Sequence, residues 1–514
     1  MVFLTKGRMV DKFAVFKSTE IRLLGGVLAI LGVTFLFPGM YAFINDENPD
    51  PFFFPAIPLI TTGVVLFLMF TASENLRAVN GLIMIGITWL AMFFVGAIPY
   101  LMFGMTPVNA LFESVNGFTT TGSTTVDSVF YWPESLMLWR AMSTWLGGIA
   151  IVIIFIYILP FFGLGRIFFN NELEGSGTSR YSMRLQTAAS SFIKVYIILT
   201  VINFVILILL QVPLLNAVCM SLTTISTGGI LVSDTSLIDT SISIQFVTMI
   251  FMLIGGTNFY LHFKAISTRS PKVYLRSKEL RYLLLYFLLV SVFLFIFRIG
   301  SISDLGLQLD DYVVDYWETL FTVISIGTTT GLSVYDFTQS SDIVLAILVF
   351  LMLIGASAGS TSGGIKFSRM RILLGFIKNS MMNLLHPNAV YSVKVDGEDV
   401  PDPRVMATVA TVLLYMVTVL IAMIIFMSAG LEWGDSIGLA VGFVTNTGVG
   451  FGDFGPLGNY DSLSNALKIL LIILMWAGRL EITLALVFFT PSFWREVLYA
   501  RRSSKIYRKI LSRR

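Results

Sequence analysis

The chain contains very little of what disulfide-linked and zinc-binding proteins need. Its 514 residues include a single cysteine, Cys219, and only two histidines, His262 and His386, which lie far apart in the sequence. One cysteine cannot form an internal disulfide, and the Cys and His spacing of a classical zinc site is absent. Because Cys219 lies in an apolar stretch, we expect it to be a small packing residue.

Charged residues are also scarce. They make up 13% of the chain against 56% hydrophobic residues, and the mean hydropathy is +0.83. Soluble domains are about one quarter charged, so this composition excludes an ordinary soluble protein. Apolar segments long enough to cross a membrane core of about 30 Å recur along the whole length, with short polar connections between them. We therefore predict an all-α polytopic membrane protein.

The motifs of common enzyme classes are missing as well. The sequence has no metal-ligand cluster, no nucleotide loop of the Walker type, no Ser-His-Asp set and no dinucleotide fingerprint after a predicted strand. We expect no enzymatic activity, no bound organic cofactor and no nucleic-acid partner.

Positive charge is distributed unevenly along the chain. Lys and Arg gather in five segments, at residues 6–22, 166–184, 264–281, 366–404 and 495–514. The segments between them are mainly acidic, and an acidic outer face would raise the local cation concentration at a pore mouth. By the positive-inside rule the basic segments are cytoplasmic. We expect a multi-pass protein of a bacterial inner (plasma) membrane with both termini in the cytoplasm.

A motif of a hydroxyl residue or Asn, then Thr, then Gly occurs four times, each time after a short apolar run. The copies are Thr120-Thr121-Gly122, Ser226-Thr227-Gly228, Thr329-Thr330-Gly331 and Asn446-Thr447-Gly448. One copy is common loop chemistry, but four copies in matching positions indicate a fourfold repeat. Gly adopts a positive φ without a Cβ penalty, which suits a backbone whose carbonyls all turn toward one axis. Four such segments predict a cation filter.

The repeat organises the rest of the chain. The apolar runs before the motifs, such as residues 108–118 and 437–445, are too short to span a membrane and must enter it and return. Each unit is predicted to hold an inward-to-outward helix, this re-entrant segment and an outward-to-inward helix, around a pseudo-fourfold pore. The first apolar run, near Ile21, lacks a cleavage site and is predicted to be a retained helix. The predicted boundaries are 1–75 for two additional N-terminal helices, 76–165, 185–265, 278–375 and 400–495 for the four pore repeats, and 496–514 for a basic cytoplasmic tail.

Small residues recur in the helices that follow the motifs. Gly147-Gly148 and Gly255-Gly256 favour close helix packing. The third helix carries ten consecutive small residues at 355–364, and each Gly costs a helix about 1 kcal/mol, so we expect a break into a polar loop there. Below the filter, this loop is predicted to be a movable gate. The residues assigned to the gate are Gly355, Gly359, Ser360, Thr361, Gly363, Gly364 and Arg479.

Several charged residues lie inside predicted membrane segments. Arg479, in the last helix, would cost at least about 2.5 kcal/mol unless it faces water or a partner. It is interpreted either as a structural residue, which pairs with Glu481 or forms an interhelical bridge, or as a pore residue that repels cations and bonds to carbonyls of the third unit's loop. Glu113 and Arg140 are predicted to pair and brace the first filter strand. Asn116 either hydrogen-bonds the filter backbone or only packs.

Three stretches, 138–148, 359–364 and 478–482, look like family signatures. With the repeat, they make the chain similar to the TrkH branch of the Trk/Ktr/HKT superfamily of potassium transporters over nearly its whole length. The resemblance implies potassium uptake through a single pore per subunit, with a potassium ion in the filter. It also implies a homodimer and a cytoplasmic TrkA-type regulatory partner that binds nucleotides.

The resemblance also assigns roles to particular residues. The family's gating loop corresponds to residues 355–364, and its pore arginine to Arg479. Relatives with Ser at the first filter glycine tend to pass sodium, so Gly122 favours potassium. The four filter glycines of the family correspond to Gly122, Gly228, Gly331 and Gly448.

Alternatives remain open at this stage. A cation symporter coupled to protons or sodium is the main rival, although such transporters usually have inverted repeats and here all four units run the same way. The basic cytoplasmic segments suit anionic membrane lipid as well as a protein partner. Lys366 and Arg369, just beyond the broken helix, are better placed to transmit a partner's movement to the gate.

Overall fold

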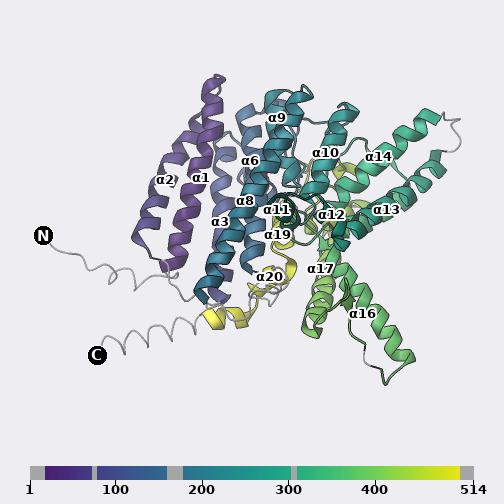
Figure 1. The fold of residues 1–514 in the computed structure, drawn as a ribbon. Coiled ribbons are helices and arrows are strands. Elements are labelled where there is room, and N and C mark those ends of the chain that lie inside the picture. The colour runs from purple at the N-terminus through teal and green to yellow at the C-terminus, as the bar shows by residue number, and fades with distance from the viewer. Residues whose placement is uncertain (1–17, 72–77, 159–177, 303–308, 390, 498–514) are drawn as a thin grey trace, which may run out of the picture. The chain divides into compact units, whose positions relative to one another are not determined.

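The computed structural model describes residues 18–71, 78–158, 178–302, 309–389 and 391–497. Helices dominate these residues (Figure 1), in agreement with the predicted all-α class. The chain divides into two compact units, one formed within residues 1–105 and 490–514 and the other within residues 106–489.

The first unit contains the two additional helices that we expected at the N-terminus. These are α1 (Ser18–Ile44) and α2 (Asp50–Met69). They pack closely at Gly25 and Gly63, because a Cβ on Gly25 would lie 2.7 Å from the Gly63 carbonyl oxygen. Small residues at such contacts are typical of membrane helices. The unit continues through α3 (Ala78–Gly96) and α4 (Ile98–Met102), beyond the predicted boundary at residue 75.

A helix precedes each of the four motifs in the second unit, and three of these helices are short. They are α5 (Pro107–Phe118), α9 (Leu214–Ile225), α14 (Leu309–Gly327) and α18 (Trp433–Val444). Three of them, α5, α9 and α18, have 12 residues. At 1.5 Å per residue they are about 18 Å long, which is too short to cross a bilayer core.

Long apolar helices make up the rest of the membrane-spanning structure. In the second unit they are α6 (Glu134–Ile158), α8 (Thr178–Leu209), α13 (Lys278–Ile302) and α17 (Asp402–Ser428). Within the described ranges, seven helical stretches are long and apolar enough to cross a membrane, or eight if one bent pair is counted as a span.

The helices that follow the second, third and fourth motifs are all broken. They are α10 (Ile242–Gly255) with α11 (Phe259–Thr268) and α12 (Lys272–Arg276), α15 (Asp342–Leu353) with α16 (Phe367–Leu385), and α19 (Asn465–Arg479) with α20 (Ile482–Val487). The predicted break within 355–364 is confirmed, and β1 (Ile354–Gly355) pairs in parallel with β2 (Ile365–Lys366) across it. Beyond α16, β3 (Lys394–Val395) and β4 (Glu398–Asp399) form an antiparallel hairpin.

The break after the second motif was not predicted. We expected Gly255-Gly256 to serve helix packing, but α10 ends there and the chain bends by 97° into α11. The new helix is stabilised at once, because the Asn258 side chain accepts a hydrogen bond from the Tyr260 amide. Gly147-Gly148, in contrast, lies within the continuous helix α6 and packs closely, with Gly147 against the Phe118 carbonyl.

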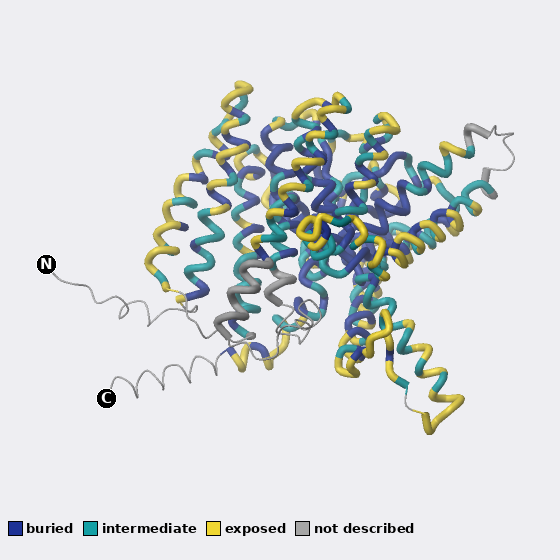
Figure 2. The backbone as a smooth tube through the Cα atoms, in the orientation of Figure 1, coloured by how far each residue is buried: buried dark blue, intermediate teal, exposed yellow. Residues whose placement is uncertain are grey.

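Burial is concentrated where the short helices end. Figure 2 shows the buried backbone gathered in the middle of the second unit, and the motif residues are among the most buried there. Cys219, on α9, is 1% exposed, which confirms the packing position predicted for it.

Candidate ion-binding site

The helices α5, α9, α14 and α18 end in the same hydrogen-bonded turn. After α5, the amides of Thr119, Thr120 and Thr121 donate to the carbonyls of Val115, Gly117 and Asn116. The same intervals recur after α9, α14 and α18, where the third of these bonds joins Gly228 to Thr223, Thr330 to Ser325 and Thr447 to Gly442. This is the Schellman arrangement, which satisfies the last carbonyls of a helix. We call the four turns, residues 119–122, 226–229, 328–331 and 445–448, the filter segments.

The second residue of each filter segment has left-handed backbone geometry. These residues are Thr120 (φ 51°), Thr227 (φ 52°), Thr329 (φ 58°) and Asn446 (φ 56°). Gly usually fills this place, and a β-branched residue there costs roughly 1–3 kcal/mol, so surrounding contacts must hold it. Three of the four are β-branched Thr and the fourth is Asn, which tolerates this geometry better. Left-handed geometry in four equivalent places points to a functional constraint.

The last residue of each filter segment is a glycine with positive φ. These glycines are Gly122 (93°), Gly229 (61°), Gly331 (79°) and Gly448 (71°). The structural equivalent in the second segment is therefore Gly229, one residue beyond the glycine that the sequence motif selects. Gly228 instead occupies the position of Thr121, Thr330 and Thr447 in the hydrogen-bond pattern.

The four segments form a closed ring around one another. A Cβ placed on Gly122 would lie 2.8 Å from the carbonyl oxygen of Gly228 in the second segment. Moving round the ring, a Cβ on Gly229 would overlap the Thr330 carbonyl, one on Gly331 the Thr447 carbonyl, and one on Gly448 the Thr121 carbonyl, all at shorter distances. Each glycine therefore allows the neighbouring carbonyl to approach. Such a ring of backbone carbonyls can replace the hydration shell of a cation.

Hydroxyl pairs hold three of the four segments in shape. The side-chain oxygens lie 2.8 Å apart in Thr119–Thr121, 2.8 Å in Thr328–Thr330 and 2.9 Å in Thr445–Thr447. The first Thr of each pair directly precedes the sequence motif. A Thr two residues before another Thr is the sequence signal for this bridge, which our prediction did not include.

The first filter segment is supported from behind by a buried ion pair. Arg140 Nε lies 3.1 Å from Glu113 Oε2, and both side chains are at most 3% exposed. Glu113 Oε1 also accepts hydrogen bonds from the Thr125 amide and the Thr124 hydroxyl, just after the segment. The expected pair is confirmed.

Asn116 also makes the hydrogen bond that we considered, because its carboxamide oxygen accepts from the Ser123 amide at 2.9 Å.

We expect the substitution Glu113→Gln to lower the free energy of unfolding by about 3–5 kcal/mol, because it leaves the Arg140 guanidinium buried without its counter-charge. Thermal unfolding of the purified protein in detergent measures the loss. The matched control is Asp315→Asn. Asp315 forms a more exposed pair with Arg298, which keeps Glu318 as a second partner, so this change should cost under about 1 kcal/mol. Equal losses in the two variants would contradict the bracing role.

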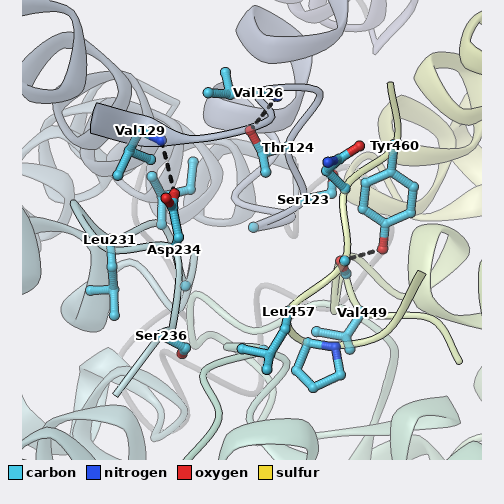
Figure 3. A pocket seen from close by; sticks show the side chains of 18 of the residues that line it. Ser123, Thr124, Val126, Val129, Leu231, Asp234, Ser236, Val449, Leu457 and Tyr460 are labelled. Atoms are coloured by element: carbon cyan, nitrogen blue, oxygen red, sulfur yellow. Dashed lines mark hydrogen bonds between the residues drawn. The ribbon is translucent and has the colours of Figure 1, made fainter. Parts of the chain in front are cut away.

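A small cavity opens where the chain leaves the filter segments (Figure 3). It measures about 110 Å³ and is lined by residues from all four repeats. Two acidic residues, Asp127 and Asp234, lie in its wall. Asp234 accepts hydrogen bonds from the Ser128 hydroxyl and the Val129 amide, and Tyr460 donates to the Gly448 carbonyl at 3.0 Å. The wall therefore combines negative charge with backbone carbonyls.

Arg479 lies against the loop of the broken third helix. Its Nη1 donates to the Thr361 carbonyl at 2.7 Å, and the residue is 3% exposed. The predicted contact with the loop is therefore present. The alternative partner, Glu481, instead pairs with Arg369 of α16 at 2.5 Å. That pairing joins residues more than a hundred positions apart, so the sequence carried no signal for it.

The remaining loop residues form a tight turn beside the filter segments. Gly355 lies in β1, and Gly359 (φ 74°) and Gly364 (φ 65°) have left-handed backbone geometry. The hydroxyls of Ser360 and Ser362 lie 2.8 Å apart. The Gly363 amide donates to the Thr329 hydroxyl at 2.7 Å, so the loop bonds directly to the third filter segment.

Comparison with known proteins places these features in a family. Residues 52–496 match the family model TrkH, described as a cation transport protein. The chain is 29% identical to the Trk system potassium uptake protein TrkH of Salmonella typhimurium over 92% of its own length and 99% of that protein. It is 28% identical to an uncharacterized cation transporter of Methanocaldococcus jannaschii over 92% of its length and 96% of that protein.

A solved structure matches as well. The crystal structure of the potassium transporter TrkH from Vibrio parahaemolyticus superposes with a TM-score of 0.83 at 26% identity, covering 93% of this chain and 99% of that chain. The family match spans most of the sequence and both units of the structure. This chain belongs to the TrkH family of cation transport proteins.

Proposed function

We propose that the protein takes up potassium across the membrane through a channel-like pore whose filter is the ring of four segments. The observation that carries this proposal is the approach of each segment's glycine to the carbonyl of the next. The four helices that precede the filter segments add the negative ends of their dipoles at the same place, which favours a partly dehydrated cation. The names of similar proteins as potassium uptake proteins support the choice of ion. Membership in a family of transport proteins also makes the chain a transporter rather than an enzyme.

The proposed ion-binding residues are those of the four motifs together with Gly229. In each segment the backbone carbonyls would face the ion, and the hydroxyl pairs would fix their positions. The buried carboxylates argue against coupling of ion transport to protons. In the described part of the second unit, Glu113 is the most buried carboxylate, and its partner Arg140 neutralises it. A proton relay would need an accessible acidic group along the path.

We further propose that the loop at residues 355–364 is a gate and that Arg479 is a barrier below the filter. The contact of Arg479 with the Thr361 carbonyl supports a shared site of action. Lys366 lies at the end of the loop, and Arg369 of α16 pairs with Glu481, two residues after Arg479. Movement of α16 would therefore reach both the loop and Arg479. A cytoplasmic TrkA-type partner that binds nucleotides would act through α16.

The assembly and location follow the same proposal. We infer a homodimer in a bacterial inner membrane, with both termini and the basic segments in the cytoplasm. The uneven distribution of Lys and Arg supports this orientation. The same basic segments would contact anionic lipid headgroups.

The direct test is rubidium flux into liposomes that contain only the purified protein. We expect uptake that potassium blocks, that sodium leaves largely unchanged, and that does not depend on an imposed proton gradient. Uptake that requires the proton or sodium gradient would establish a symporter instead. No uptake, with or without a regulatory partner, would contradict the proposed substrate.

Gly122 offers a test of ion selectivity. A Cβ at this position would meet the Gly228 carbonyl at 2.8 Å, the mildest overlap in the ring. We expect Gly122→Ser to retain rubidium flux, while sodium permeability relative to rubidium rises about tenfold, corresponding to 1.4 kcal/mol. The matched control is Gly104→Ser, since Gly104 has nearly the same φ (95°) but open surroundings. An unchanged permeability ratio in Gly122→Ser would contradict the filter assignment.

A further inference from the structure

The second filter segment lacks the internal bridge that stabilises the other three. Thr121, Thr330 and Thr447 each share a hydroxyl contact with the Thr two residues earlier. Gly228 occupies their place and has no side chain. The vacated space is filled from α6, because a Cβ on Gly228 would overlap the Thr144 methyl group. Thr144 packs there but makes its own hydrogen bond to the Arg140 carbonyl, so it supplies no hydroxyl to the segment.

The loop at residues 355–364 instead brings a hydroxyl to Thr227, the residue before Gly228. The single O–H of Thr227 has two acceptors, the Thr361 hydroxyl at 3.2 Å and the Ser226 carbonyl at 2.7 Å. Thr227 is the strained left-handed residue of the second segment. Both threonine side chains are fully buried, so when the contact with Thr361 breaks, the Thr227 hydroxyl keeps the Ser226 carbonyl of its own segment as a partner but loses its link to the loop.

Thr361 is also bonded to the helix ends around this segment. Its hydroxyl lies 3.1 Å from the Ile225 carbonyl, at the end of α9, and 3.0 Å from the Gly255 carbonyl, at the end of α10. Its amide donates to the same Gly255 carbonyl at 3.2 Å. A hydroxyl has one O–H and two lone pairs, so Thr361 can accept from Thr227 while it donates to one of these carbonyls.

The backbone carbonyl of Thr361 contacts a different partner, Arg479. It accepts the hydrogen bond from Arg479 at 2.7 Å. One loop residue thus touches the filter with its side chain and Arg479 with its backbone. A movement of the loop at Thr361 would therefore change both contacts.

From this arrangement we infer that Thr361 is a positioning residue that couples the loop to the filter, so that the ion selectivity of the second segment depends on the position of the loop. This inference rests on the proposed function of the ring as a cation filter. When the loop moves to admit ions, Thr227 loses the hydroxyl that braces its left-handed backbone. The carbonyl of Gly228, which follows Thr227, is then less firmly held than the carbonyls of Thr121, Thr330 and Thr447.

The test compares Thr361→Val with Thr361→Ser in liposomes, measuring both rubidium flux and the rubidium-to-sodium permeability ratio. Val keeps the shape of Thr and removes the hydroxyl, and we expect the ratio to fall about tenfold, as the loss of one buried hydrogen bond implies. Ser keeps the hydroxyl and should keep the ratio. The control is Thr248→Val. Thr248 is buried on α10 and bonds within its own helix, so its loss should not alter selectivity.

A second variant breaks the same bond from the other side. Thr227→Val should lower the permeability ratio at least as far, because it also removes the bond to the Ser226 carbonyl, and the double variant should show no fall beyond that of Thr227→Val alone. If Thr361→Val is not recovered as folded protein, Thr227→Val alone tests the coupling between the loop and the filter. If Thr361→Val raises rubidium flux at an unchanged permeability ratio, the loop only blocks the pore. The proposed coupling between the loop and the filter is then wrong. Absence of rubidium flux in the unmodified protein would instead reject the proposed function itself.

Discussion

Replacing Gly448 with alanine is expected to reduce rubidium flux at least about a hundredfold. A Cβ there would overlap the Thr121 carbonyl, the tightest of the four ring contacts, and it would sit on a backbone with φ 71°. Overpacking of this kind costs about 1–3 kcal/mol, before the strain of positive φ is added. A shift of the Thr121 carbonyl large enough to relieve this overlap would disrupt the ring. Rubidium flux into liposomes is the measurement.

The control for this prediction separates overlap from backbone strain. Gly430 also has a positive φ, of 93°, but no atom lies within 4 Å of the place where its Cβ would be. Gly430→Ala should therefore retain flux. If Gly448→Ala conducts as well as Gly430→Ala, the segments do not form the proposed ring of carbonyls around the ion path.

Removing the charge of Arg479 is the second change with a large expected effect. We expect Arg479→Ala to raise basal rubidium flux at least about tenfold and to weaken regulation. Two unit charges 4 Å apart repel by about 1 kcal/mol even in water, and by more where the dielectric constant is lower. The same change also removes the hydrogen bond that holds the Thr361 carbonyl. Flux in liposomes, with and without the regulatory partner, measures both effects.

Two further variants make this prediction specific. Arg479→Lys keeps the positive charge and should raise flux much less. Arg298→Gln removes a largely buried ion pair with Asp315 and Glu318 and leaves Arg479 unaltered, so it tests whether the loss of an ion pair alone mimics the effect. If Arg479→Ala and Arg298→Gln give the same flux, Arg479 is a structural residue and not a barrier.

The sequence predicted features that depend on local composition. The four motifs stand out because polar residues and glycine interrupt apolar runs, and the break after Leu353 follows from ten small residues in succession. The pair of Glu113 with Arg140 could be predicted because two charges in membrane segments of the same repeat need each other.

Features that depend on backbone register or on distant contacts could not be predicted in this way. The choice of Gly229 over Gly228 follows from the Schellman turn after α9, which counts residues from the helix end and not from the motif. The break at Gly255 arises because Gly256 and Asn258 stop one helix and start another, while the similar Gly147-Gly148 remains helical. The link of Thr361 to Thr227 joins two repeats, and nothing near either residue in the sequence indicates it.

The most direct test of the central claim is the position of a bound ion. Crystals grown in rubidium salt and measured at the rubidium absorption edge would locate it by anomalous scattering. We predict a peak inside the ring formed by the carbonyls of Thr121, Gly228, Thr330 and Thr447, and its loss when potassium replaces rubidium. A rubidium peak elsewhere in the membrane-spanning structure, with none in the ring, would contradict the assignment of these four segments as the ion filter.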